Sequence, residues 1–211
     1  MNTLLLFLLL AGGLALVYLF IIRPWQLTWG ATKDEINQSL PGDDIVNKPH
    51  FVATRAVSIQ VPPAEVWKWI IQIGSARAGF YSIDLIDNAN QPSAREILPE
   101  YQKIELDTFI PFTPDQKNGM WVKGFKEDEH ILWWDRKGNG TWVWYLRQNK
   151  AGETRLMTRL QTRYDFSFPW IIYYIFYDFG DILMMSKCLL GIKRRAELNL
   201  RFPILFLQSG R

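Results

Sequence analysis

The stretch Ser167–Glu197 most constrains what this chain can fold into, because it has the pattern of one long amphipathic helix. Ser167 can cap the first turn, where Pro169 is tolerated because first-turn amides have no partner inside the helix. Asp178 and Asp181 are expected to lie off the apolar stripe, which needs a large apolar partner surface such as a β-sheet. The predicted stripe consists of Ile171, Ile175, Phe179, Ile182 and Leu189, with Ile172, Leu183 and Leu190 beside them.

An apolar run without a charge, Leu4–Ile22, stands at the front of the chain. At helical rise it roughly matches a bilayer core of about 30 Å, so residues 1–23 are predicted to be a transmembrane anchor. A cleaved signal peptide is the alternative, but the run is long, no Lys or Arg precedes it, and no small-x-small site follows it. Arg23 and Lys33 follow the run, so the positive-inside tendency predicts a single-pass membrane protein with a cytoplasmic globular domain.

Residues 24–49 are rich in turn-forming Pro, Gly, Asn and Asp and are predicted to be a linker. Within this segment Thr32 and Glu35 have the spacing of a capping box, which predicts a short helix. The other end of the chain, residues 201–211, is an apolar tail. This tail is expected to pack on the domain or to be disordered, and it could also dip into a membrane interface.

Residues 50–200 are predicted to form one globular domain of the α+β class, in which an antiparallel sheet of six or seven strands curves around the C-terminal helix. Alternating side chains indicate strands, and a Pro-Pro pair followed by apolar residues indicates the start of a helix. The predicted strands are 51–61, 108–112, 120–126, 130–135, 141–147 and 154–164, with helices from residue 63 to Gly74 and over 81–88.

Three segments in this order resemble the helix-grip fold of the START/Bet v 1-like superfamily, also called SRPBCC or polyketide cyclase/dehydrase-like. They are TRAVSIQVPPAEVWKWIIQIG (54–74), GFYSIDLIDN (79–88) and LLGIKRRAE (189–197). The resemblance implies a cavity between the concave sheet face and the long helix. Members of this superfamily include lipid carriers, binders of hormones and polyketides, and aromatase/cyclases, so the resemblance transfers no catalytic residue.

Composition and motifs exclude several classes of function. A net charge of +3 is too small to indicate nucleic-acid binding. Neither His50 nor His130 has a second ligand at metal-binding spacing, and no phosphate-binding glycine loop or nucleophile elbow is present, so no metal or cofactor is predicted. Cys188 cannot form an internal disulfide because it is the one cysteine of the chain.

The resemblance and the strand alternation together suggest which residues line the cavity. On 154–164 the set containing Leu156 is assigned to the concave face, and on 141–147 the tryptophan set is preferred. Arg155, Arg159 and Arg163 then form a row on the other face, expected to be solvated or to attract anionic lipid. The candidate ligand-binding residues are Tyr81, Trp121, Trp133, Trp142, Trp144, Thr158, Leu160, Thr162, Tyr164, Phe179 and Leu183.

The sequence thus predicts a membrane-anchored domain that binds a hydrophobic small molecule or lipid. A cyclase or dehydratase-type enzyme acting on an apolar substrate is the alternative, and it would be favoured if Asp84, Arg159 or His130 converged on the pocket. A third possibility is a structural domain whose core is filled by the tryptophans. The ligand and the oligomeric state are left open.

Overall fold

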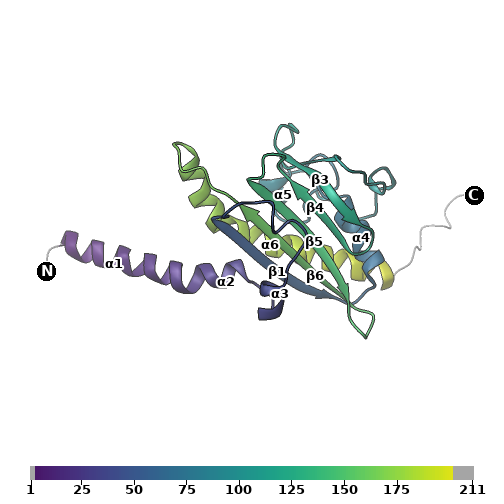
Figure 1. The fold of residues 1–211 in the computed structure, drawn as a ribbon, viewed down its shortest axis with the longest axis horizontal. Coiled ribbons are helices and arrows are strands. Elements are labelled where there is room, and N and C mark those ends of the chain that lie inside the picture. Colours follow the sequence, from purple (N-terminus) through teal and green to yellow (C-terminus); the bar gives the residue numbers. More distant parts are fainter. Residues whose placement is uncertain (1–2, 202–211) are drawn as a thin grey trace, which may run out of the picture.

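The computed structural model describes residues 3–201 and confirms the α+β, helix-grip architecture (Figure 1). One antiparallel sheet has the strand order β1-β6-β5-β4-β3-β2, so the first strand pairs with the last and hairpins build the rest. The strands are β1 (Phe51–Ile59), β2 (Phe109–Pro111), β3 (Gly119–Lys126), β4 (His130–Trp134), β5 (Gly140–Gln148) and β6 (Thr154–Thr162). The helices are α1 (Thr3–Val17), α2 (Arg23–Leu27), α3 (Lys33–Asn37), α4 (Pro63–Ile71), α5 (Asp84–Asp87) and α6 (Trp170–Arg201), with a π-helical segment η1 (Tyr18–Ile22) and a 3-10 turn η2 (Pro99–Tyr101).

The long helix α6 lies across the inner, concave face of the sheet (Figure 1). It begins at Trp170, three residues after the predicted cap at Ser167. The main-chain amide of Ser167 donates a hydrogen bond to the Asp165 carboxylate. The helix also continues past the predicted end at residue 197 to Arg201. The apolar tail predicted over residues 201–211 lies outside the described residues except for Arg201.

The buried stripe of α6 differs from the predicted one. Asp181 was expected off the apolar stripe, but its side chain is buried. Phe179 and Leu183 were expected on or beside the stripe, but their side chains are 51% and 60% exposed. The N-terminal half of the helix is apolar on nearly every side, so periodicity alone could not identify its inner face. Among the α6 side chains that the structure describes, the buried ones are Asp181, Ile182, Met185, Cys188, Leu189, Ile192 and Ala196.

The strand alternation separates two faces of the sheet as predicted. Trp142, Trp144 and Leu146 of β5 join the main core between the sheet and α6, together with Leu156 and Leu160 of β6. The tryptophan set of β5 and the set of β6 that contains Leu156 therefore face inward, as predicted.

The outer face of β6 is covered by residues 30–46, which belong to the predicted linker. Arg159 is 5% exposed there, and its guanidinium donates to the Asp43 carboxylate and to the main-chain oxygens of Gln38, Glu35 and Ile36. The predicted capping box of α3 is present, and Glu35 in turn accepts from Arg155 at 2.8 Å.

The prediction of a solvated or lipid-binding arginine row is therefore wrong for Arg155 and Arg159. Their charges are neutralised inside the protein, and Arg163 alone of the three is exposed. The segment 30–46 is thus packed onto the sheet as well as connecting it to the N-terminal helices.

The C-terminal half of α6 packs closely against the loop before α5. A Cβ atom on Gly191 would lie 2.2 Å from the main-chain oxygen of Tyr81, so only glycine lets the helix approach this loop. Tyr81 itself has a positive φ of 58°. Its ring packs against Trp69 of α4, which fixes the loop to the core.

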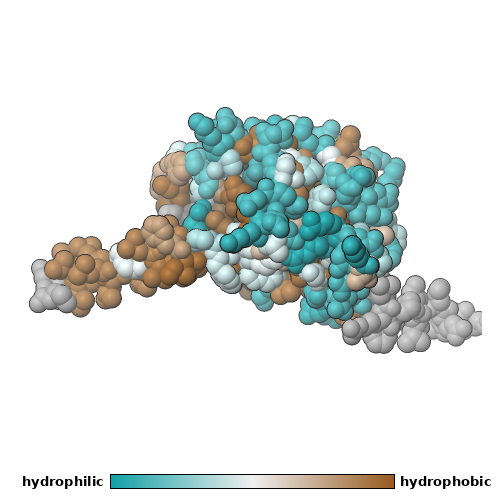
Figure 2. Space-filling view, turned by 60° about the horizontal axis from the view of Figure 1, so that its bottom comes forward, coloured by the Kyte–Doolittle hydropathy of each residue, from teal (hydrophilic) through white to brown (hydrophobic). Residues whose placement is uncertain are grey.

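At the other end of the chain, Thr3–Leu27 forms a continuous helical stretch of 25 residues through α1, η1 and α2. By length and composition it is apolar enough to cross a membrane. Figure 2 shows it as a hydrophobic rod projecting from a largely hydrophilic domain.

Candidate functional site

A layer of tryptophans lines the inner face of the sheet under α6. Trp133, Trp142 and Trp144 come from the adjacent strands β4 and β5, and their ring centroids lie 4.9–5.8 Å apart. The Trp142 indole Nε1 donates to the Thr158 hydroxyl at 2.6 Å, and that hydroxyl donates to the Val143 carbonyl at 3.0 Å. These hydrogen bonds fix the orientation of Trp142 within an otherwise apolar surface.

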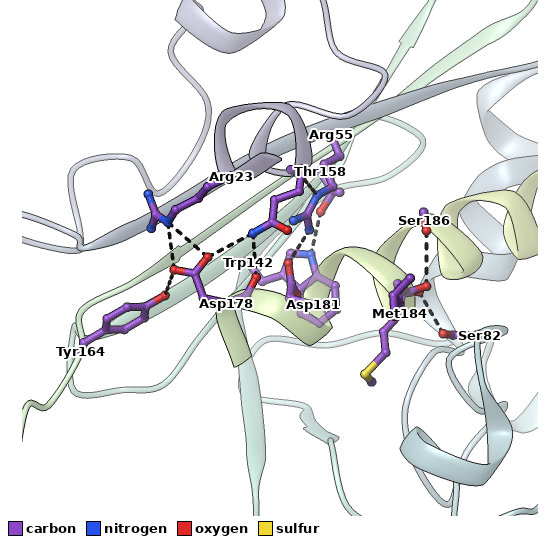
Figure 3. A network of polar contacts seen from close by, with 12 residues as sticks. Arg23, Arg55, Ser82, Trp142, Thr158, Tyr164, Asp178, Asp181, Met184 and Ser186 are labelled. Atoms are coloured by element: carbon purple, nitrogen blue, oxygen red, sulfur yellow. Dashed lines mark hydrogen bonds and ion pairs between the residues drawn. The ribbon is translucent and has the colours of Figure 1, made fainter. Parts of the chain in front are cut away.

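Arg55 of β1 adds a positive charge to this inner face. The strand register places it opposite Thr158, and its side chain is 1% exposed. Its Nε donates to the main-chain oxygen of Gln26 at 2.7 Å, and its Nη1 donates to the carboxylate of Asp181 on α6 (Figure 3). Its Nη2 has no hydrogen-bond partner within the described part of the chain, so one donor nitrogen of a buried guanidinium remains available.

Asp181 and Arg55 form an ion pair that crosses from the helix to the sheet. The Asp181 side chain is 8% exposed, and burial raises the pKa of this carboxyl while the Arg55 guanidinium acts to lower it. An isolated charge at this depth would be strongly unfavourable, so each residue depends on the other. The pair places polar groups among aromatic rings, which is the composition of a site for a mainly apolar ligand with a polar end.

A second polar cluster, centred on Asp178, lies one helical turn earlier on α6. The Asp178 carboxylate accepts from Arg23 Nε at 3.0 Å and from the Tyr164 hydroxyl at 3.3 Å (Figure 3). It also accepts from the Tyr18 hydroxyl at 3.0 Å. Gln26 Nε2 donates to the main-chain oxygen of Asp178 at 2.8 Å. Burial and the neighbouring Asp178 charge raise the pKa of Tyr164. This cluster joins the end of the apolar helix to α6 and β6.

Five of the predicted site residues come together on the inner face. Leu160 lies opposite Trp142 in the β5–β6 register, next to the tryptophans and Thr158, and all are buried. Whether they contact a ligand stays a prediction. The five residues are Trp133, Trp142, Trp144, Thr158 and Leu160.

The other predicted site residues lie elsewhere. Trp121 is on the outer face of β3, since its neighbours on either side belong to the core, and the Arg136 guanidinium lies 4.6 Å from its ring centroid. Tyr81 is buried against α4, and its hydroxyl accepts from Gln72 and donates to the Trp69 carbonyl. These bonds explain its position without a ligand.

Phe179 and Leu183 point away from the sheet, and Phe179 stacks on Tyr18 of η1 with ring centroids 4.0 Å apart. Thr162 is half-buried at the end of β6. Tyr164 belongs to the Asp178 cluster rather than to the tryptophan layer.

The sequence analysis missed Arg55 and Asp181 as site residues. The sequence of β1 contains the signal, because Arg55 lies on the same face of this strand as the apolar residues Phe51, Ala53 and Val57. A charge in the middle of an apolar strand face requires a buried partner.

The residues proposed for an enzyme do not converge. The Asp84 carboxylate accepts a hydrogen bond from Ser93, Arg159 lies on the outer face of the sheet, and His130 contacts Glu129 at 3.3 Å. Among residues 3–201, no group of three or more His, Cys, Asp and Glu side chains is placed to hold a metal ion.

Comparisons with known proteins returned structural likenesses only. The chain matches no protein-family model and no curated protein. It is similar to a conserved protein of unknown function from Enterococcus faecalis, at 12% identity and a TM-score of 0.42 over 79% of this chain and 80% of that one. It is also similar to the Polyketide_cyc-like protein Cgl2372 from Corynebacterium glutamicum, at 14% identity and a TM-score of 0.38 over 75% and 97% of the two chains.

A third solved structure, Ms6760 from Mycobacterium smegmatis, is 15% identical with a TM-score of 0.42 over 72% of this chain and 92% of that one. The printed name of Cgl2372, Polyketide_cyc-like, agrees with the superfamily that the sequence segments resemble. Likenesses at this level carry no argument about function, and the class of the fold rests on the strand order and on the helix across the sheet.

Proposed function

We propose that this protein is a membrane-anchored domain that binds a hydrophobic small molecule or lipid between the inner face of the sheet and α6. The observation that carries the proposal is the buried guanidinium of Arg55, which has an unpartnered Nη2 beside a layer of tryptophans. A ligand with an apolar body and a polar end would pack on the rings and accept a hydrogen bond from this nitrogen.

The anchor proposal is supported by the way the apolar helix joins the domain. Arg23 and Gln26 bond to Asp178 directly after the apolar run, and the Trp29 carbonyl accepts from Ala56 of β1. Removal of the apolar run as a signal peptide would cut immediately beside residues that belong to the fold. A retained single-pass anchor keeps these contacts.

We further propose that the domain faces the cytoplasm, because Arg23 and Lys33 follow the span. Protease treatment of sealed membrane vesicles of known orientation tests this. Digestion of the domain only when the cytoplasmic side is accessible is expected. Digestion from the opposite side would contradict the orientation.

Ligand binding is tested first by native mass spectrometry of the full chain released from detergent. The full chain is needed because residues 30–46 cover the outer face of the sheet. A peptide of residues 1–30 in the same detergent is the control, since lipids around an anchor would bind to both. One apolar molecule retained per full chain and absent from the peptide is expected, whereas equal retention by both would contradict a site in the domain.

The site is then located by quenching of tryptophan fluorescence with a brominated fatty acid. Trp142→Phe removes an indole from the inner face, and Trp121→Phe removes one from the outer face as the matched control. The quenched fraction should fall in the first variant and stay at the parental level in the second. Equal quenching in both variants would place the fatty acid elsewhere.

One observation favours the alternative of a cyclase or dehydratase-type enzyme. Arg55 and Asp181 face each other between sheet and helix, and burial raises the pKa of Asp181. A carboxyl in such a setting can exchange a proton with a bound substrate. If the parent chain converts an extracted ligand and Asp181→Asn binds it without converting it, this alternative is established. If the parent chain leaves the ligand chemically unchanged, the alternative is excluded.

A further inference from the structure

The loop before α6 and the first turns of this helix expose a concentrated group of large apolar side chains. Phe168, Phe176 and Phe166 are 81%, 72% and 60% exposed, and Trp170 and Tyr173 are about half exposed. No charged residue occurs from residue 166 to residue 177, a segment that we call the aromatic tip. A surface of this size and composition is unusual in contact with water and indicates an interaction site.

The aromatic tip lies beside the point where the apolar helix leaves the domain. Directly after the tip, Asp178 bonds to Arg23, and Phe179 stacks on Tyr18. The first turns of α6 project past the end of the sheet at the same end from which α1 leaves (Figure 1). Figure 2 shows hydrophobic surface at that end of the domain as well.

The kinds of residue in the tip match a membrane interface. Trp and Tyr prefer the level of the lipid headgroups, and Phe and Ile favour the acyl boundary beneath it. A helix that enters a bilayer at Arg23 brings a lipid surface next to Phe179 and the turns that precede it. The continuity with α1 therefore favours lipid over a second copy of the chain.

We propose that the aromatic tip inserts into the same bilayer surface that α1 crosses, so that the domain contacts the membrane at two places. This inference rests on the proposed anchor. The Asp178 cluster would then hold both membrane contacts in a fixed relation to each other.

The test measures the environment of single spin labels on the full chain in phosphatidylcholine–phosphatidylglycerol vesicles. Labels are attached at Phe176→Cys in the tip, at Leu10→Cys in α1, and at Lys150→Cys in the β5–β6 turn, which the strand register places at the opposite end of the sheet. All three positions are exposed, so the substitutions leave the packing intact. Cys188 is buried, and the parent chain carried through the same labelling measures any reaction there.

Collision rates with oxygen, which concentrates in lipid, and with a water-soluble nickel complex distinguish the outcomes. The proposal expects the oxygen-to-nickel ratio at residue 176 to exceed that at residue 150 and to approach that at residue 10. A ratio at 176 equal to that at 150, with residue 10 in lipid, leaves the anchor standing and overturns the inference. Low collision rates with both reagents at 176 would show a protein contact and would also overturn it, and a water-exposed residue 10 would overturn anchor and inference together.

Discussion

The ion pair between Arg55 and Asp181 should govern the stability of this domain. The two side chains are 1% and 8% exposed, so removing one of them leaves a charge almost fully buried without its partner. We expect Arg55→Met to lower the free energy of unfolding by about 3–5 kcal/mol, which is the usual cost of breaking a buried pair. The double variant Arg55→Met/Asp181→Leu removes both charges and should recover most of this loss, because two apolar side chains suit the site.

The pH dependence of the single variant gives an independent check. Burial raises the pKa of Asp181 and Arg55 lowers it, so in Arg55→Met the pKa of Asp181 rises further. A carboxyl whose pKa is higher in the folded chain stabilises the fold fully below its unfolded pKa of about 4, and this stability is lost as the pH rises through the folded pKa. The variant should therefore be more stable at pH 4 than at pH 7 relative to the parent.

The assay is denaturant unfolding of the full chain in detergent, followed by the fluorescence of its buried tryptophans, at pH 4 and pH 7. Parent, both single variants and the double variant form a double-mutant cycle. Single variants within about 1 kcal/mol of the parent would refute the claim that the pair is buried and coupled. A double variant as unstable as the sum of the two single losses would refute the coupling.

Three further predictions concern other parts of the fold. Arg159→Met should lower the free energy of unfolding by about 2–3 kcal/mol, because it removes a buried guanidinium from its carboxylate. Arg163→Met, at an exposed position directly after β6, should change it by less than about 0.5 kcal/mol, and equal effects of the two in urea unfolding would contradict the packing of residues 30–46. Gly191→Ala should lower the thermal midpoint, because its Cβ would lie 2.2 Å from the main-chain oxygen of Tyr81. Gly180→Ala has open space around its Cβ and should stabilise α6 by about 1 kcal/mol. Calorimetry that shows the reverse order of the two variants would refute the contact between Gly191 and Tyr81. Burial raises the pKa of Asp87 to about 6, so the parent should lose up to about 1.4 kcal/mol of stability per pH unit as the pH rises from about 4 towards 6. Asp87→Asn should not show this loss. Unfolding curves of both proteins across this pH range will measure it.

Local patterns determined the elements of this protein. Period-two alternation predicted the strands within one or two residues, as in 154–164 against the observed Thr154–Thr162, because each strand has one face in the core. The capping box at Thr32 and Glu35 depends only on residues three apart and was equally accessible. The apolar run at the front needs no tertiary contact to be recognised, since its length and composition are its signal.

Only the tertiary structure decided the partners of the charged side chains and the inner face of α6. Arg159 looked solvated because nothing in β6 shows that a segment more than a hundred residues earlier folds over it. Asp181 looked like an exposed acid because its partner Arg55 lies far away in sequence, on a strand that reaches it only when the sheet closes beneath the helix. The free energy of a charge depends on what surrounds it in space, and that information is distributed over the whole chain.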